Sequence, residues 1–299
     1  MKSSLRVLAS FILLFISVPA WSQTDLLDMI SDEDESTERE FVTNAFKSTR
    51  VIGSHSLEHV AGGVLDFRIM HRFGNINGGG YELFGLDQAT IRLGLDYGVT
   101  DRITVGFGRS SLYKELDGFV KYRLLWQSKG KKAIPLSIIL VSGTTANMLK
   151  WSDPDRKNYF SSRMGFYHQI IIGRKFSDAF SLQIAPMMVH RNLVKTNEDK
   201  HDIYAAEIGA RVKLTRRLAL TADYFYILPD QLPDENTHPL SIGFDIETGG
   251  HVFQLHFTNA PAMNEKTFIT ENKGDWSKGD IHFGFNISRV FTLDSGKKK

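Results

Sequence analysis

The sequence has no cysteine, and this absence excludes several kinds of chemistry. Disulfides, cysteine-based metal sites, thiol nucleophiles and a lipid anchor on cysteine are all ruled out. Long hydrophobic runs are scarce as well, because beyond the N-terminus no stretch approaches the roughly 20 apolar residues of a transmembrane helix. Any membrane-spanning part must therefore be built from strands. Basic residues are dispersed and not gathered in one patch, so nucleic acid is not an expected partner.

The N-terminus has the pattern of a secretory signal peptide over residues 1–22. Lys2 and Arg6 precede an apolar run from Val7 to Val18, and small residues follow at Ala20 and Ser22. We expect export and cleavage before Gln23. The remaining chain has equal numbers of basic and acidic residues.

From residue 58 to residue 293, apolar and polar side chains alternate with a period of two. Ile91 and Leu93 share one face of a predicted strand, for example, whereas Arg92 and Asp96 share the other. The same split occurs in the segments 204–214, 253–258 and 281–288. This pattern is typical of strands that face lipid on one side and water on the other.

The predicted connections are short and long in strict alternation. Short ones lie at Val99–Arg102, Ser128–Lys132, Phe176–Ala179, Leu214–Arg217 and Thr248–Gly250, and long ones lie at Gly74–Asp87, Ser111–Asp117, Asn147–Phe160, Asn192–Asp202, Leu228–His238 and Asn259–Lys278. Such sorting places all short turns at one end, as in barrels with periplasmic turns and extracellular loops. We predict an all-β fold, an antiparallel up-and-down transmembrane barrel of about twelve strands. Pro135 and Pro186 weigh against the strands drawn through them, because proline cannot donate to a ladder.

The segment 23–57 is acidic from Asp25 to Glu40, and residues 294–299 form a basic tail. We expect the acidic segment to be periplasmic and partly disordered or helical, with a short helix around Thr37 to Thr49. Two sharper alternatives are a site for a periplasmic partner and a plug that enters the barrel lumen.

Three stretches of the chain resemble a known family. They are Gly63-Val64-Leu65-Asp66-Phe67-Arg68, His71-Arg72-Phe73-Gly74 and the run from Gly85 to Gly98, and the likeness continues to the end of the chain. The family is domain of unknown function 5777, a membrane-bound β-barrel domain of Gram-negative bacteria. The resemblance implies an outer-membrane barrel and assigns no activity, so no site residue is transferred from it.

Charged side chains on the polar face of the predicted strands are the candidates to line the lumen, because charges at membrane depth must face water or one another. They carry both signs: Asp66, Arg68, Arg72, Arg92, Asp96, Lys121, Arg123, Glu207, Arg211, Lys213, Asp223, Asp245 and Glu247. Two interpretations remain open. The charges pair with each other and fill a narrow barrel, or they form rings that select solutes in a pore.

Two patterns suggest chemistry at first sight. His55-Ser56-Leu57-Glu58-His59 has the spacing of a zinc-hydrolase motif, yet Gly62 and Gly63 follow it closely and argue against the helix that such a site needs. His168 with Ser161 or Ser162, and His190, are the residues available to a hydrolase, but they form no recognisable motif. We therefore expect no catalytic, cofactor or metal site and no enzymatic activity.

The expected function is passage or binding of a small solute across the outer membrane of a Gram-negative bacterium. The alternatives are a structural or partner-binding barrel with a closed lumen and, less favoured, a membrane-embedded hydrolase. The expected partners are outer-membrane lipid, the barrel assembly machinery, a small solute and a periplasmic partner of the acidic N-terminus.

Overall fold

The computed structural model describes residues 38–248 and 251–293. The expected signal peptide, the acidic residues 23–37 and the basic tail lie outside the described residues. In the described part of the chain, no helix is long and apolar enough to cross a membrane.

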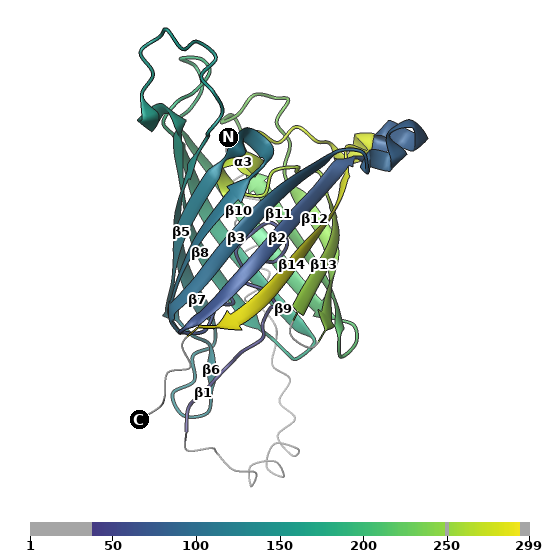
Figure 1. The fold of residues 1–299 in the computed structure, drawn as a ribbon. Helices are drawn as coiled ribbons and strands as arrows, with labels where there is room; N and C mark the ends of the chain where they lie inside the picture. Colours follow the sequence, from purple (N-terminus) through teal and green to yellow (C-terminus); the bar gives the residue numbers. More distant parts are fainter. Residues whose placement is uncertain (1–37, 249–250, 294–299) are drawn as a thin grey trace, which may run out of the picture.

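Twelve antiparallel strands form one closed barrel, which confirms the predicted fold class (Figure 1). Each strand pairs with the next along the chain, and the last pairs with the first. The barrel strands are β2 (Val64–Asn75), β3 (Ala89–Thr100), β4 (Ile103–Ser110), β5 (Leu116–Leu125), β7 (Ser137–Ala146), β8 (Met164–Lys175), β9 (Phe180–Arg191), β10 (Asp202–Lys213), β11 (Leu218–Ile227), β12 (Leu240–Thr248), β13 (His251–Thr258) and β14 (His282–Thr292). The remaining elements are β1 (Glu40–Phe41), β6 (Ser128–Lys129), the 3-10 turns η1 (Ile76–Gly85), η2 (Leu112–Lys114), η3 (Phe160–Arg163) and η4 (Trp276–Lys278), and the helix α3 (Glu265–Thr270).

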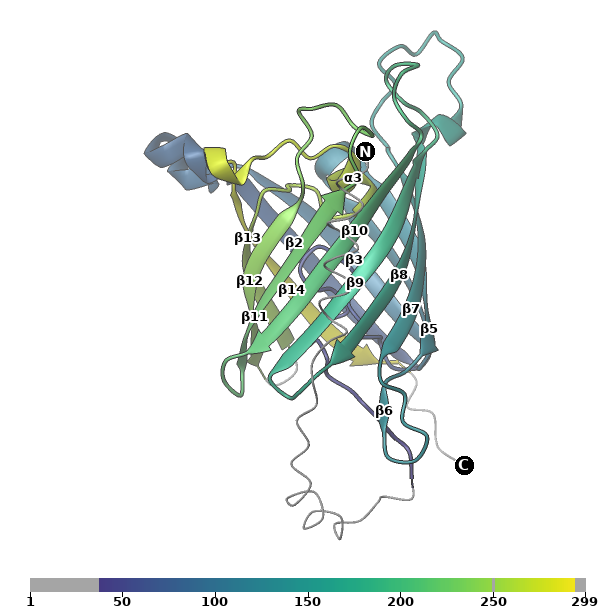
Figure 2. The same ribbon diagram turned by 180° about the vertical axis from the view of Figure 1, so that it is seen from behind.

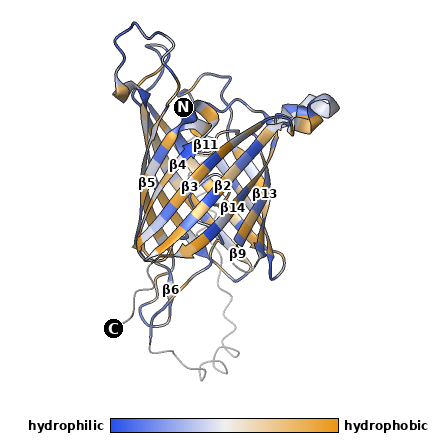
Figure 3. Ribbon diagram, in the orientation of Figure 1, coloured by the Kyte–Doolittle hydropathy of each residue, from blue (hydrophilic) through white to orange (hydrophobic). Residues whose placement is uncertain are grey.

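The period-two pattern sorts side chains between the two faces of the wall. In β3, Leu93 and Leu95 are exposed on the outside, and Arg92 and Asp96 are buried inside. Apolar and polar residues alternate in the same way along the strands in view in Figure 3. The outer surface therefore suits lipid, and the inner surface suits water or buried polar partners.

Short and long connections lie at opposite ends of the barrel, which we call the turn end and the loop end. The bounds of several connections differ from the prediction, two of them for a clear reason. The short turn expected at Ser128–Lys132 is a longer connection over residues 126–136, because it includes β6, which lies below the turn end (Figure 2) and pairs with β1. The connection from β4 to β5 is shorter than predicted, because β5 already begins at Leu116.

The two prolines that argued against strands have different outcomes. Pro135 lies in the longer connection, outside any strand. Pro186 lies within β9 and pairs with Ala206 of β10, while the pairs between β8 and β9 are interrupted beside it, between Gln169 and Ile172. The ladder is lost on the side where proline has no N–H to donate.

The prediction of a short helix around Thr37 to Thr49 is wrong for the residues of this range that the structure describes. Residues 38–49 contain no helix, and only β1 is regular there. Beyond β1 the chain enters the lumen, rises and returns to the turn end before β2, so residues 44–60 form an internal segment that we call the plug (Figure 1). The segment 23–57 is therefore not wholly a periplasmic linker, and the plug alternative describes its second half.

The long connection between β13 and β14 also enters the lumen, from the loop end. It includes α3, whose Thr267, Phe268 and Ile269 are buried, and α3 lies against β8 and β9. Twelve strands enclose more space than wall side chains alone fill. In this barrel the plug and α3 occupy that space from opposite ends.

Candidate functional site in the barrel lumen

The plug folds back on itself as a tight hairpin. Arg50 and His55 form a β-bridge, the N–H of Val51 donates to the carbonyl of Ser54 at 2.9 Å, and the N–H of Ser56 donates to Thr49 at 3.0 Å. Gly53 lies at the tip. Below the hairpin, the carboxylate of Glu58 accepts from the N–H groups of Ala45 and Phe46 and so ties the two arms together.

Side chains of the wall bind the main chain of the plug. Asp223 of β11 accepts from three consecutive N–H groups, those of Ile52, Gly53 and Ser54, at 3.1, 2.7 and 3.1 Å. Lys121 of β5 donates to the carbonyls of the returning arm, at 2.7 Å for Ser56. The plug therefore satisfies its peptide groups without entering a strand ladder.

Neutral amides of the wall bind the same backbone. Gln254 donates to the carbonyl of Val51 at 2.6 Å, Asn286 donates to that of Ile52 at 3.0 Å and Gln183 donates to that of His55 at 2.8 Å. Side chains from β9, β13 and β14 thus surround the hairpin tip. The plug is bound on several sides of the lumen.

The thirteen charged candidates lie on the inner face or at its turn end. All are buried except Lys213 and Glu247, which are half-buried. Seven of them contact the plug directly: Arg68, Asp96, Lys121, Arg123, Glu207, Asp223 and Glu247. These charges therefore bind the plug in this structure, and a role in solute selection stays a prediction.

Some of the candidates also pair with one another within the wall. Arg68 lies 2.6 Å from Asp66, and Arg211 lies 3.8 Å from Asp245 and 3.6 Å from Glu247. Arg92 pairs with Asp117. This residue was predicted to end a loop, but it lies near the start of β5. Of the two interpretations of the lumen charges, the structure shows pairing for some of them, while others bind the plug, and a solute-selecting role stays a prediction.

The helix α3 has its own anchor at the loop end. Asn264 caps its first turn by accepting from the N–H of Thr267 at 3.0 Å, and Asn264 also donates to the buried Glu115 at 2.7 Å. Burial, with neighbouring Glu271, raises the pKa of Tyr113 to about 12, so its hydroxyl stays protonated and bonds to Glu271. The connection from β4 to β5 therefore fixes α3 at both of its ends.

The plug and α3 meet inside the barrel. The guanidinium of Arg50 forms a fully buried ion pair with the carboxylate of Glu265, and it also donates to the carbonyl of Gly53 at 3.0 Å. His55 lies 3.4 Å from the same carboxylate and 3.3 Å from the hydroxyl of Tyr167. This junction is a direct polar link between the insert from the turn end and the insert from the loop end.

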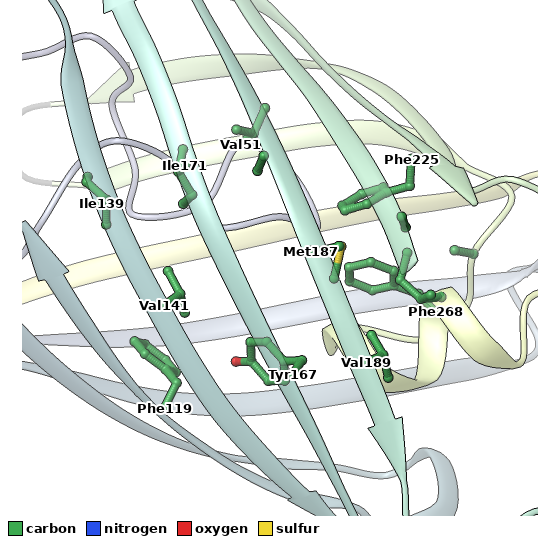
Figure 4. Packing of buried hydrophobic residues seen from close by; sticks show 14 of the residues in the cluster. Val51, Phe119, Ile139, Val141, Tyr167, Ile171, Met187, Val189, Phe225 and Phe268 are labelled. Atoms are coloured by element: carbon green, nitrogen blue, oxygen red, sulfur yellow. The ribbon is translucent and has the colours of Figure 1, made fainter. Parts of the chain in front are cut away.

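An apolar cluster covers one side of the junction (Figure 4). Val51 of the plug and Phe268 of α3 belong to it with inward side chains of β5 and β7–β11, and Phe268 packs on Phe225 with ring centroids 4.8 Å apart. The other wall, from β12 through β14 to β3, carries mostly charged and amide groups. The inward apolar side chains are therefore concentrated on one side of the lumen, where they lie among charged groups such as Lys121, Glu207 and Asp223, and the other side is mainly polar.

The two histidines of the zinc-like pattern, His55 and His59, do not converge on one site. His55 points to Tyr167 and Glu265, whereas His59 contacts Thr104 at 3.2 Å, so the two imidazoles contact different partners. In the described part of the chain, no group of three or more histidine and acidic side chains has the geometry of a metal site. The zinc-like spacing therefore does not form a ligand cluster.

The histidines considered for a hydrolase also have partners other than those proposed. His168 is on the outer, lipid-facing side of β8 and bonds to Ser142 at 3.0 Å, not to Ser161 or Ser162. His190 bonds to Asp202 at 2.6 Å at the loop end. Both histidines lie on the outer face of the wall, where His168 pairs with Met188 and His190 pairs with Phe166, and their side chains bond to different partners.

Several residues of the lumen site were missed. Gln254 and Asn286 lie on the polar face that the period-two pattern identified, but only charged residues were selected from that face. Gln183 belongs to the strand that carries Pro186. Arg50 and Glu265 lie in segments assigned to a linker and a loop, and alternation carries no information there.

The fold is that of a membrane β-barrel, with apolar side chains outside and a lumen filled by its own chain. The chain belongs to domain of unknown function 5777, described as a membrane bound beta barrel domain, whose profile matches residues 46–291. The match begins within the plug at Phe46. Among curated proteins, none matches this chain.

Solved structures of other barrels are distantly similar. The NanC porin is 8% identical over 76% of this chain and 98% of its own, with a TM-score of 0.47. OmpF of Salmonella typhi, in complex with daunomycin, is 6% identical over 76% and 97%, with a TM-score of 0.39. LpxR of Salmonella typhimurium is 11% identical over 76% and 99%, with a TM-score of 0.31.

Proposed function

We propose that this protein is an outer-membrane barrel whose lumen is closed by its own N-terminal plug and which passes small polar solutes only when the plug withdraws. The turn end is then periplasmic and the loop end extracellular. The observation that carries this proposal is the binding of the plug main chain by wall side chains, above all by Asp223 and Lys121.

The chemistry of these contacts favours a plug that can leave. A carboxylate, an ammonium group and amides that bind peptide groups can bind water equally well once the hairpin has gone. An empty lumen would then be lined by charged groups of both signs, as in a water-filled pore. The same wall can therefore stabilise a closed and an open state.

A permanently closed barrel is the second candidate, and the Arg50–Glu265 pair favours it. The pair is fully buried, and separating it leaves an uncompensated charge on each side, which is strongly destabilising in a dry environment. In that case the loops and the N-terminus would serve as surfaces for partners. The two candidates differ in whether the lumen ever opens.

Thiol accessibility tests the closed lumen. Because the chain has no cysteine, Ser54→Cys supplies a single thiol at the buried hairpin tip, and Ser177→Cys supplies a matched thiol in the exposed turn between β8 and β9. In the folded, membrane-inserted protein we expect a charged maleimide to label position 177 quickly and position 54 slowly. Equal labelling rates at positions 54 and 177 would contradict a plug that is bound inside a closed lumen.

A further inference from the structure

Apolar side chains gather on a part of the loop end that the lumen does not use. Residues 76–88 and 275–281, which we call the rim projection, extend sideways from the ends of β2, β3 and β14 (Figure 1). Tyr81, Leu83, Phe84 and Leu86 are 96%, 54%, 61% and 46% exposed. Four large apolar side chains so close together and so exposed are unusual on a surface that faces only water.

The rim projection has a defined conformation. The N–H of Ile76 donates to the carbonyl of Ile281 at 2.9 Å, and Asn77 donates to the carboxylate of Asp280 at 2.7 Å, so its two segments are joined. Leu83 and Phe84 have φ values of 46° and 53°, in the left-handed region that bulky residues seldom adopt. This backbone leaves both side chains uncovered by the rest of the protein.

The outer wall beneath the rim projection is aromatic. His71 of β2 stacks on Phe285 of β14 at 4.8 Å, and Phe73 stacks on Phe283 at 5.7 Å, all on the lipid-facing side of the strands. Such outward aromatics mark the boundary between hydrocarbon and water in membrane barrels. The exposed side chains of the rim projection thus continue an aromatic surface at the level where lipid ends.

We propose that the rim projection inserts Tyr81, Leu83 and Phe84 into the boundary of acyl chains and headgroups in the lipid leaflet at the loop end. The sideways direction places these side chains over the surrounding leaflet, whereas the connection between β7 and β8 extends along the barrel axis (Figure 2). Glu82 and Asp87 carry negative charge beside them, so apolar contact and not attraction to anionic headgroups provides the binding. The rim projection is a lateral anchor that fixes the height and orientation of the barrel.

Depth-dependent quenching tests this anchor. Phe84→Cys, carrying an environment-sensitive fluorophore, is refolded into phosphatidylcholine vesicles that contain lipids brominated on the acyl chains. Tyr159→Cys, at a 55% exposed aromatic of the connection between β7 and β8, is the matched control. We expect brominated lipid to quench the fluorophore at position 84 at least about twofold more strongly than the one at position 159. Aqueous iodide should quench position 159 more strongly than position 84.

Two results would overturn the proposal. One is equal iodide quenching at positions 84 and 159 with no quenching by brominated lipid. The other is shielding at position 84 that disappears on dilution of the barrel in excess lipid, since this would identify a second copy and not lipid as the partner. Leu83→Cys repeats the measurement if Phe84→Cys does not fold, and neither variant touches the lumen.

Discussion

Asp223 shows how one side chain can position an entire segment. Its carboxylate lies inside the barrel wall and accepts from three successive peptide N–H groups, at residues 52, 53 and 54. Hydrogen bonds to an ionised acceptor are stronger than those between neutral groups, and a buried donor that loses its partner is costly. The position of the plug in the lumen therefore depends strongly on Asp223.

Replacing Asp223 with alanine should loosen the hairpin tip. We expect a loss of about 1–3 kcal/mol in the free energy of unfolding, because three buried N–H groups lose their acceptor. Asp223→Asn should lose less, since the amide oxygen can still accept. Urea titrations of the refolded barrel, followed by heat-modifiable gel mobility, give these values. An Asp223→Ala loss no greater than that of Asp178→Ala, at an exposed turn, would contradict the role assigned to Asp223.

At the scale of elements, the plug and α3 come from opposite ends of the barrel and depend on each other through Arg50 and Glu265. Breaking a buried ion pair costs about 3–5 kcal/mol, because one charge remains buried without a partner, whereas replacing both partners by apolar residues is often neutral. Arg50→Met and Glu265→Leu should therefore each be more destabilising than the double variant. The same urea titrations measure all three, and additive losses would show that the pair does not couple the two elements.

Sequence patterns predicted some elements well and others not at all. Period-two alternation is imposed by lipid on one face of every barrel strand, so the twelve strands and their closure could be predicted. No such constraint acts on a segment inside the lumen. Val51, Ile52 and Leu57 were apolar residues in a segment taken as a linker, and they were the available signal for the plug.

The candidate site could also be predicted only in part from the sequence. Charged side chains such as Arg68 and Glu207 could be placed on the inner face from their phase along a strand, whereas their partners could not, because those partners lie in segments without a period. The alternation in the flanking strands predicted a long connection at Asn259–Lys278, which the structure extends to residue 281, but not that α3 would turn inward. That direction is set by Glu115 and by the apolar cluster around Phe268, which are contacts between distant parts of the chain.

At the scale of the whole molecule, the barrel is wide enough to need filling, and its own chain fills it. A barrel of about eight strands is filled by wall side chains, and one of 16 to 18 strands leaves a channel. Twelve strands lie between these limits, so the state of the lumen depends on the inserts. Closure in the resting state and opening on loss of the plug form the central claim.

Conductance of the purified, refolded protein in a planar bilayer tests this claim most directly, with heat-modifiable mobility as the control for folding. We predict that the chain without residues 1–22 gives no steady conductance and that a variant also lacking residues 38–60 gives steady, ion-selective steps. Steady conductance of the chain with its plug would contradict closure, and a folded but silent variant without the plug would contradict the proposed pore.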